Sequence, residues 1–433
     1  MNSIVLLTID CLRRDHVGCY GYERPTTPNI DDFSKDSVQF EGYANCPGTR
    51  WAFQTLHTGM FHNQINGLGI PEGYNSLAQV LRNAGYTTAG FVDNGWVSRD
   101  YGYDSGFDKF YSIKDTNSQA PFFKRIGVKM SNLLGSSITH RLLKPVHDYW
   151  VAKQGDKGGF KPPHSDADTV DEVIKWLDIR SEPYFLWVHF MNAHTPYGYW
   201  PKHLEAIRGD SDIDHTIHPG KDELIKKGNE PPQHVIDTYD AGIRYVDQQV
   251  GRVLDNIEDS ATVVITGDHG EEFGKFEGFH QANLHRTMTN VPLIIKDTKV
   301  NKKREGKIAG HIDIPATLLT AGGIKVPDHW DGNPLQTVTR DDTDAIFFTL
   351  KDGERAVQLG KWKLIKKGNE KTSLWEQIDQ DEIERSLEKG PTEKLSYLLN
   401  EFWESVSTLS TGYKEVDMNQ ITRENLKDLG YLE

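Results

Sequence analysis

The chain has 433 residues, enough for two or three domains or for one large α/β domain with an appendage. Its 49 lysines and arginines are outnumbered by 63 aspartates and glutamates, and the net charge of −14 argues against a protein whose whole surface binds nucleic acid. Hydrophobic residues make up 37% of the chain and charged residues 26%, which is typical of a globular protein and excludes a disordered or fibrous one.

The cysteine content and the start of the chain bear on its location. Cys11, Cys19 and Cys46 are an odd number of cysteines close together in the sequence, so we expect no disulfide framework and a reducing environment. The apolar run 4–9 lacks the charged flank and cleavage site of a signal peptide. No stretch approaches the roughly 20 apolar residues that span a bilayer. The sequence therefore predicts a cytoplasmic protein without a transmembrane segment.

Apolar runs and helical patterns alternate along the first three quarters of the chain. Five runs predict buried parallel strands: residues 4–9, 87–92, 184–190, 261–266 and 291–295. The helical patterns between them cover residues 77–84, 167–177 and 235–257. In the last of these, apolar residues recur every three or four positions, which predicts one apolar stripe packed on a sheet. Alternating strands and helices predict an α/β layer fold.

Two segments interrupt this alternation. Residues 114–162 hold nine lysines and arginines against three aspartates, although the chain as a whole is acidic. Such an insert could cover an anionic substrate, contact an anionic lipid surface as a peripheral membrane element, or be a solvated helical excursion. Residues 201–232 are polar and punctuated by Gly and Pro, which predicts a long surface loop.

The last quarter of the chain has a different pattern. Short strand-like pieces at 345–350 and 361–366 are followed by a helical pattern at 392–406. This order predicts a small α+β subdomain. We therefore divide the chain into a large α/β domain, residues 1–340, with the basic insert at about 114–162, and a C-terminal subdomain, residues 341–433.

Polar residues that end apolar strands are candidates for chemistry, because ligands of open α/β sheets collect at the carboxyl ends of the strands. Asp10 ends the first run, and Asp268 and His269 follow the fourth. Two carboxylates with an adjacent imidazole form a plausible divalent-metal site. The alternative is that either aspartate only caps the helix that follows it.

These and other segments resemble the sulfatase-like branch of the alkaline phosphatase superfamily. The matching stretches occur in the expected order from residue 4 to about residue 325: residues 6–16, 26–30, 58–59, 188–197, 239–241, 268–271, 291–295 and 311–313. The resemblance implies a mixed, mostly parallel central sheet flanked by helices, with a small antiparallel C-terminal subdomain.

The position of the family's nucleophile departs from the sulfatase pattern. In formylglycine-dependent members, a Cys or Ser stands nine positions before the Thr of a Thr-Gly pair, and here that position is Thr49. Cys46 lies twelve positions before Thr58 and is the alternative, as is a site that has lost its nucleophile. A threonine β-carbon carries a methyl group, so its oxidation gives at most a ketone and never the aldehyde. Thr49 resembles instead the threonine nucleophile of phosphodiesterases and phosphoglycerol transferases in the superfamily.

The resemblance also implies a metal set of Asp10, Asp268 and His269, with Thr49 as the hydroxyl that the ion activates. Gly48 permits a tight approach before Thr49, and the predicted helix 51–57 would turn its first N–H groups toward an incoming anion.

Two departures affect the metal site, the first leaving the identity of the ion open and the second favouring a single ion. Cys11 follows Asp10 where formylglycine-dependent sulfatases have a second aspartate, and Asn192 takes a position often held by Asp. We therefore expect one divalent ion, with Ca, Mn, Mg and Zn left open.

Four more residues gain roles from the resemblance. His194 and His280 match residues that contact the oxygens of the transferred group or the leaving group. Arg50 and Asn94 are candidates to bind the anion, and a solvated surface arginine is the alternative for Arg50.

The sequence as a whole predicts a metal-dependent hydrolase or transferase that acts on phosphoesters, with phosphodiesters favoured, through Thr49. A sulfatase that works without formylglycine is one alternative, and a catalytically inactive binding protein of the same fold is another. The expected partner is an anionic ester, glycan-linked or lipid-linked, and not nucleic acid.

Overall fold

The computed structural model describes residues 2–111, 165–211, 231–368 and 371–407, apart from residues 66, 277, 279, 339 and 342. The basic insert 114–162 lies outside the described residues. The predicted loop 201–232 is described only at its two ends, and its first part is helix α8 (Pro201–Arg208), which corrects the prediction. Pro201 stands in the first turn, the buried Leu204 packs with Ala241 of helix α9, and Trp200 stacks on Tyr245 of the same helix, so a few contacts with α9 order this polar segment. In the described part of the chain, no helix has the length and apolarity needed to cross a membrane.

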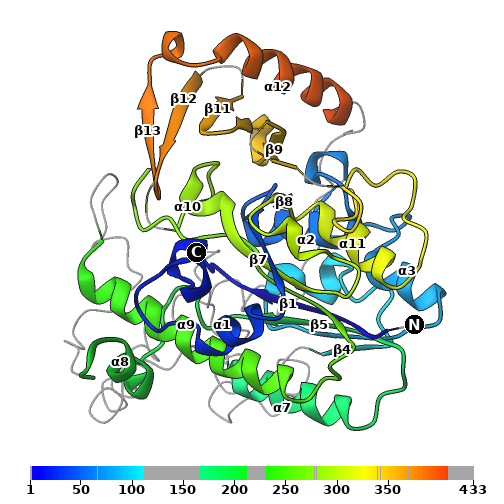
Figure 1. The fold of residues 1–433 in the computed structure, drawn as a ribbon. Coiled ribbons are helices and arrows are strands. Elements are labelled where there is room, and N and C mark those ends of the chain that lie inside the picture. The colour runs from blue at the N-terminus through cyan, green and yellow to red at the C-terminus, as the bar shows by residue number, and fades with distance from the viewer. Residues whose placement is uncertain are drawn as a thin grey trace, which may run out of the picture.

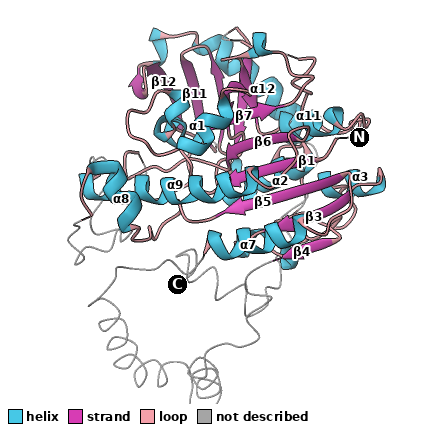
Figure 2. Cartoon of the chain, turned by 60° about the horizontal axis from the view of Figure 1, so that its bottom comes forward, coloured by secondary structure: helices cyan, strands magenta, loops and turns pink. Residues whose placement is uncertain are grey.

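The central sheet of the described residues has eight strands in the order β4-β3-β5-β1-β6-β7-β2-β8. They are β1 (Ile4–Ile9), β2 (Val38–Tyr43), β3 (Thr87–Phe91), β4 (Lys109–Tyr111), β5 (Tyr184–Phe190), β6 (Thr262–Gly267), β7 (Asn290–Lys296) and β8 (Ile308–Gly310). β4, β3, β5, β1 and β6 run parallel and lie side by side in Figure 2. The mostly parallel α/β fold is thus confirmed.

Strand β7 corrects one prediction, because it was expected to be parallel. It pairs antiparallel with both β6 and β2. A parallel connection needs a crossover of a dozen or more residues, usually a helix packed on the sheet face. The segment between β6 and β7 is instead a loop whose described residues contain one short helix, α10 (Arg286–Thr289). The chain therefore re-enters the sheet from the edge at which it left.

Helices cover both faces of the sheet, with α1, α7 and α9 below it and α2, α3 and α11 above it in Figure 1. Their bounds are α1 (Pro28–Ser34), α2 (Thr49–Thr58), α3 (Leu77–Asn83), α7 (Asp166–Leu177), α9 (Gln233–Leu254) and α11 (Asp313–Ala321). Strand β1 alternates between the two cores, since Ile4 and Leu6 pack with α2, α3 and α11 while Val5 and Leu7 pack with α1, α7 and α9. Burial on both faces explains why the parallel strands are apolar throughout.

The C-terminal part forms a five-stranded antiparallel sheet covered by one helix, at the top of Figure 1. The strands are β9 (Ala345–Thr349), β10 (Arg355–Leu359), β11 (Trp362–Lys367), β12 (Lys371–Ile378) and β13 (Asp381–Arg385), and the helix is α12 (Thr392–Ser407). Apolar residues of α12 and of β9 to β11 share one core with residues of the catalytic part such as Trp51 and Ile312. This shared core fixes the small sheet to the part of the chain that forms the central sheet.

A buried ion pair ties the small sheet to the loop before β7. Lys363 of β11 places its Nζ 3.0 Å from Glu382 Oε1 and donates to the Leu284 carbonyl and to Thr289 Oγ1. Glu382 Oε2 also accepts from the backbone N–H of Arg286 at 2.8 Å. Burial opposes ionisation of Glu382, but the charge of Lys363 and contacts with His285 and the Arg286 N–H lower its pKa to about 2.

We expect Lys363→Ala to destabilise the protein by about 3 kcal/mol or more, because Glu382 then keeps a buried charge without its partner. The free energy of unfolding in urea measures this loss. Lys361→Ala is the matched control, since Lys361 forms an exposed ion pair with Glu376 on the same small sheet and should change stability far less. Equal effects of the two substitutions would contradict the role of the buried pair.

Candidate active site

The candidate site lies at the carboxyl ends of β1, β5 and β6, where the N-terminus of α2 meets them. Asp10 follows β1, Asp268 and His269 follow β6, and His194 lies in the loop after β5. Each of these strands is buried on both sides, so its end is held firmly in place. Adjacent parallel strands thus bring together side chains that are far apart in the sequence.

Asp10 is the centre of the cluster and is completely buried. Its Oδ2 accepts from Asn94 Nδ2 at 3.2 Å and lies 3.3 Å from His189 Nε2. Its Oδ1 accepts from the Cys11 thiol at 3.1 Å and lies 3.7 Å from His269 Nε2. Burial raises the pKa of Asp10, but the neighbouring histidines outweigh burial and hold that pKa well below its usual range.

Asp268 is equally buried but less well satisfied. Its Oδ1 accepts from the backbone N–H groups of Cys11 at 3.2 Å and His269 at 2.7 Å. No described group hydrogen-bonds to its Oδ2, which lies 3.7 Å from His269 Nε2. Burial and the nearby Asp10 raise the pKa of Asp268 to about 6. A buried carboxylate oxygen without a donor is what a metal ligand looks like before the ion is added.

The raised pKa of Asp268 predicts a pH dependence of the metal-free protein. The carboxyl has an ordinary pKa of 3.8 when unfolded and about 6 when folded, so the folded state holds the proton more tightly. This contribution to stability is present below the unfolded pKa and is lost as the pH rises through about 6. In chelator, raising the pH from about 4 to about 7 should thus destabilise wild type relative to Asp268→Asn. Parallel urea titrations measure this, and a constant difference would contradict it.

Thr49 is the first residue of α2 and points its hydroxyl at this cluster. Its Oγ1 lies 3.2 Å from His269 Nε2. Since His269 Nδ1 lies 2.7 Å from the Gly270 carbonyl, to which it can only donate, the neutral ring carries its lone pair on Nε2. Gly48, just before Thr49, has a φ of 119°, and a Cβ there would lie 2.8 Å from the Trp51 ring. Only glycine allows the chain to enter the helix in this way.

Cys46, the alternative nucleophile, lies elsewhere. Its sulfur is buried between Thr55 Oγ1 at 3.2 Å and Thr349 Oγ1 at 3.3 Å, in the core shared with the small sheet. Burial raises the pKa of this thiol. Thr49, and not Cys46, is therefore the residue that the fold places beside Asp10 and His269.

The two predicted anion-binding residues flank the site in different ways. Asn94 donates its amide to Asp10 Oδ2, and its Oδ1 accepts from the backbone N–H of Trp96 at 2.9 Å. It therefore orients a carboxylate of the cluster. The Arg50 guanidinium lies over the rings of Trp96 and Trp51, with 4.1 and 4.7 Å from its central carbon to the ring centroids.

His194 and His280 lie together on the other side of Asp10. Their ring centroids are 4.5 Å apart and their planes are nearly perpendicular. His280 Nδ1 lies 2.9 Å from Glu271 Oε2, and Glu271 also accepts from Tyr197 at 3.0 Å. Burial opposes ionisation of both partners, yet Glu271 raises the pKa of His280, and His280 lowers that of Glu271 to about 2. Burial lowers the pKa of His194 to about 3, so its imidazole is neutral at physiological pH.

Three residues of the site were not predicted from the sequence. Cys11 brings its thiol between Asp10 and His280, His189 of β5 bridges Thr8 and Asp10, and Glu271 holds His280. A signal existed for Cys11, because it directly follows a strand-ending aspartate. His189 lies within an otherwise apolar, completely buried strand, where a polar residue needs a buried partner, and that was a signal too.

Asn192, by contrast, does not join the site. Its Oδ1 accepts from the backbone N–H of Asp166, and Asp166 accepts from the N–H groups of Met191 and Asn192. The side chain thus ties the end of β5 to the start of α7 and leaves the metal cluster to other residues.

The residues present fit a divalent metal ion. Ligand atoms of Asp10, His189 and Asp268 lie within 4.8 Å of one another, and so do those of Asp10, Cys11 and His269. Carboxylate oxygens and imidazole nitrogens are common ligands of such ions. The unsatisfied Oδ2 of Asp268 supports this assignment independently.

Comparison with known proteins agrees with this geometry. A family model described as Sulfatase matches residues 2–324. An arylsulfatase of Clostridium perfringens is 24% identical over 381 residues, which cover 77% of each protein. The solved structure of a 2-O GAG sulfatase superposes with a TM-score of 0.65 at 17% identity, covering 98% of this chain and 96% of that one. The phosphonate monoester hydrolase of Agrobacterium radiobacter superposes with a TM-score of 0.60 at 18% identity, covering 94% and 95%. The chain belongs to the sulfatase family of hydrolases, within the alkaline phosphatase superfamily.

Proposed function

We propose that this hydrolase cleaves phosphoesters, phosphodiesters first among them, with Thr49 as the nucleophile. The observation that carries the proposal is the 3.2 Å between Thr49 Oγ1 and His269 Nε2, beside the buried carboxylates of Asp10 and Asp268. A threonine cannot be converted to formylglycine, so its hydroxyl itself must attack.

Hydrolysis of the ester takes two steps. Thr49 Oγ1 attacks phosphorus and releases its proton to solvent, the ester P–O bond breaks, and the departing oxygen takes up a proton from solvent to leave as the alcohol. Water then attacks the same phosphorus and loses a proton, the bond to Thr49 breaks, Thr49 Oγ1 is reprotonated, and phosphate or a phosphomonoester is released.

The chain's own residues supply the surroundings for these steps. Asp10, Asp268 and His269 would hold a divalent ion, which lowers the pKa of a nearby hydroxyl and offsets negative charge in the transition state. The first N–H groups of α2 face the incoming anion from the side of Thr49. His194 and His280, whose rings lie side by side, would contact the oxygens of the transferred group or the leaving group.

The mixed donor set favours some ions over others. Imidazole suits transition ions such as Zn²⁺, whereas carboxylates alone suit Ca²⁺ and Mg²⁺. With His269 beside two aspartates, we propose Mn²⁺ or Zn²⁺ as the resident ion.

Sulfate-ester hydrolysis is the second candidate, favoured by the relatives. The arylsulfatase of Clostridium perfringens and the human iduronate 2-sulfatase, 22% identical over 338 residues, are both named for that reaction. In this chain it would also begin with attack by the Thr49 hydroxyl.

A substrate panel distinguishes the two candidates. The purified protein, loaded with Mn²⁺ or Zn²⁺, is offered matched aryl esters: a phosphodiester, a phosphomonoester, a phosphonate monoester and a sulfate. We expect the highest kcat/KM for the phosphodiester or the phosphonate monoester. A preference for the sulfate ester would overturn the phosphoester proposal and support the second candidate.

A further inference from the structure

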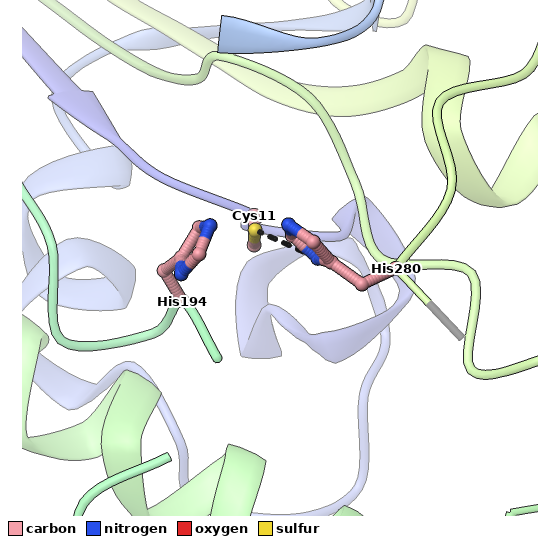
Figure 3. Close-up of side chains that lie close together, drawn as sticks. All are labelled: Cys11, His194 and His280. Atoms are coloured by element: carbon pink, nitrogen blue, oxygen red, sulfur yellow. Dashed lines mark hydrogen bonds between the residues drawn. The ribbon is translucent and has the colours of Figure 1, made fainter. Parts of the chain in front are cut away.

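A second group of metal-ligating side chains lies beside Asp10, Asp268 and His269, and Cys11 is the residue that adjoins both groups. Cys11, His194 and His280 place their ligand atoms within 4.8 Å of one another. Cys11 Sγ is 4.0 Å from His280 Nδ1, and the two rings stand on either side of the sulfur in Figure 3. The three residues come from the ends of β1 and β5 and from the loop before β7.

Hydrogen bonds position both imidazoles. Nδ1 of His280 faces Glu271 Oε2 at 2.9 Å, and Nδ1 of His194 faces the carbonyl of Thr195. The partner of His194 is an acceptor, so Nδ1 carries the proton of its neutral ring and Nε2 carries the lone pair. In His280, Nδ1 lies 2.9 Å from Glu271 Oε2 and is also the nitrogen 4.0 Å from Cys11 Sγ. A metal-ligating histidine usually donates its other ring N–H to a carboxylate or a carbonyl. The Tyr197 hydroxyl in turn donates to Glu271 Oε2 at 3.0 Å.

The backbone of Cys11 is held in a conformation that cysteine rarely adopts. Its φ of 59° lies in the left-handed region, which costs a residue with a Cβ free energy. The N–H of Cys11 donates to Asp268 Oδ1 at 3.2 Å, and its carbonyl accepts from Tyr239 at 2.5 Å. Both sides of the residue are therefore fixed, and the thiol is turned toward the histidines.

We propose that Cys11, His194 and His280 form a second metal site, for a borderline transition ion such as Zn²⁺. A thiolate with two imidazoles is a donor set that selects such ions over Ca²⁺ and Mg²⁺. Three protein ligands leave a fourth position open for an oxygen of the substrate. The Cys11 sulfur lies only 3.1 Å from Asp10 Oδ1, so this site adjoins the carboxylate site.

A second ion would change how His194 and His280 act in the proposed reaction. This point alone rests on the proposed function. The two histidines would meet the leaving oxygen through the ion and not through their own N–H groups. The binding of the second ion is independent of Thr49, so counting ions tests this site separately from the reaction.

The test counts metal ions in the full chain. Protein stripped with chelator is reloaded with Co²⁺ and separated from excess ion, and its metal content and near-ultraviolet spectrum are recorded. We expect two ions per chain with a thiolate-to-cobalt charge-transfer band for wild type. For Cys11→Ser we expect one ion and no band. Cys46→Ser is the matched control, a buried thiol away from the site, and should keep both.

His280→Ala is a second variant that keeps the proposal testable if Cys11→Ser does not fold. His280 is partly exposed, so its removal should spare the fold, and metal content should fall from two ions to one. One ion and no charge-transfer band in wild type would overturn the site. So would a second ion retained by either variant. Thr49→Ala should keep both ions, which separates this outcome from failure of the proposed reaction.

Discussion

Replacing Thr49 by alanine should reduce kcat/KM on the best ester of the panel by at least about a thousandfold, because the attacking oxygen is removed. The side chain begins α2 and accounts for little of the core, so the fold should persist. Metal content should persist as well, since Asp10, Asp268 and His269 remain. Steady-state kinetics with metal analysis of the same sample measures both.

Two companion variants sharpen this result. Thr49→Ser keeps a hydroxyl in place and should retain most of the turnover. Cys46→Ala removes the sulfur that sequence spacing alone left as an alternative, and its turnover should change only slightly, because this thiol is buried between Thr55 and Thr349. Loss of turnover in Cys46→Ala with normal turnover in Thr49→Ala would reverse the assignment.

Replacing Asp268 by asparagine should weaken binding of the resident ion at least about a hundredfold, since it removes a charged ligand. An ion present at about 100 times its dissociation constant stabilises wild type by about 2.7 kcal/mol, and most of this gain should be absent in the variant. Thermal unfolding with and without Mn²⁺ or Zn²⁺ measures the difference.

Asp247→Asn is the control for Asp268→Asn. Asp247 is also buried, and burial raises its pKa to about 6, but it accepts from the backbone N–H groups of Asn29 and Ile30 at the start of α1. Its replacement should lower stability and leave metal affinity unchanged. If Asp247→Asn lost the ion as well, the loss in Asp268→Asn would reflect general damage to the fold and not a missing ligand.

Much of the fold could be predicted from local patterns. The apolar runs gave β1, β3, β5 and β6 to within about a residue at each end, because a strand buried on both faces leaves a continuous apolar run. The apolar stripe of α9 was equally plain. Strand β2 was missed because its burial alternates at Gln39 and Glu41, and the direction of β7 was wrong because it depends on the path of a loop.

The candidate site could be predicted only in part, for a similar reason. Asp10, Asp268 and His269 directly follow strands, and the topology alone gathers them. The thiol of Cys11 and the carboxylate of Glu271 join the site through a positive φ and through a hydrogen bond across a loop, and neither leaves a periodic pattern. Asn94 was placed near the anion, whereas its amide bonds to Asp10.

Trapping the covalent intermediate tests attack by the Thr49 hydroxyl most directly. The metal-loaded enzyme is mixed with the best phosphoester, quenched in acid within a turnover, digested and sequenced by mass spectrometry. We expect one added phosphoryl group on Thr49 alone, still carrying its second alcohol when the substrate is a diester, and none in Thr49→Ala. An added phosphoryl group on any other residue, or full turnover by Thr49→Ala, would contradict attack by Thr49.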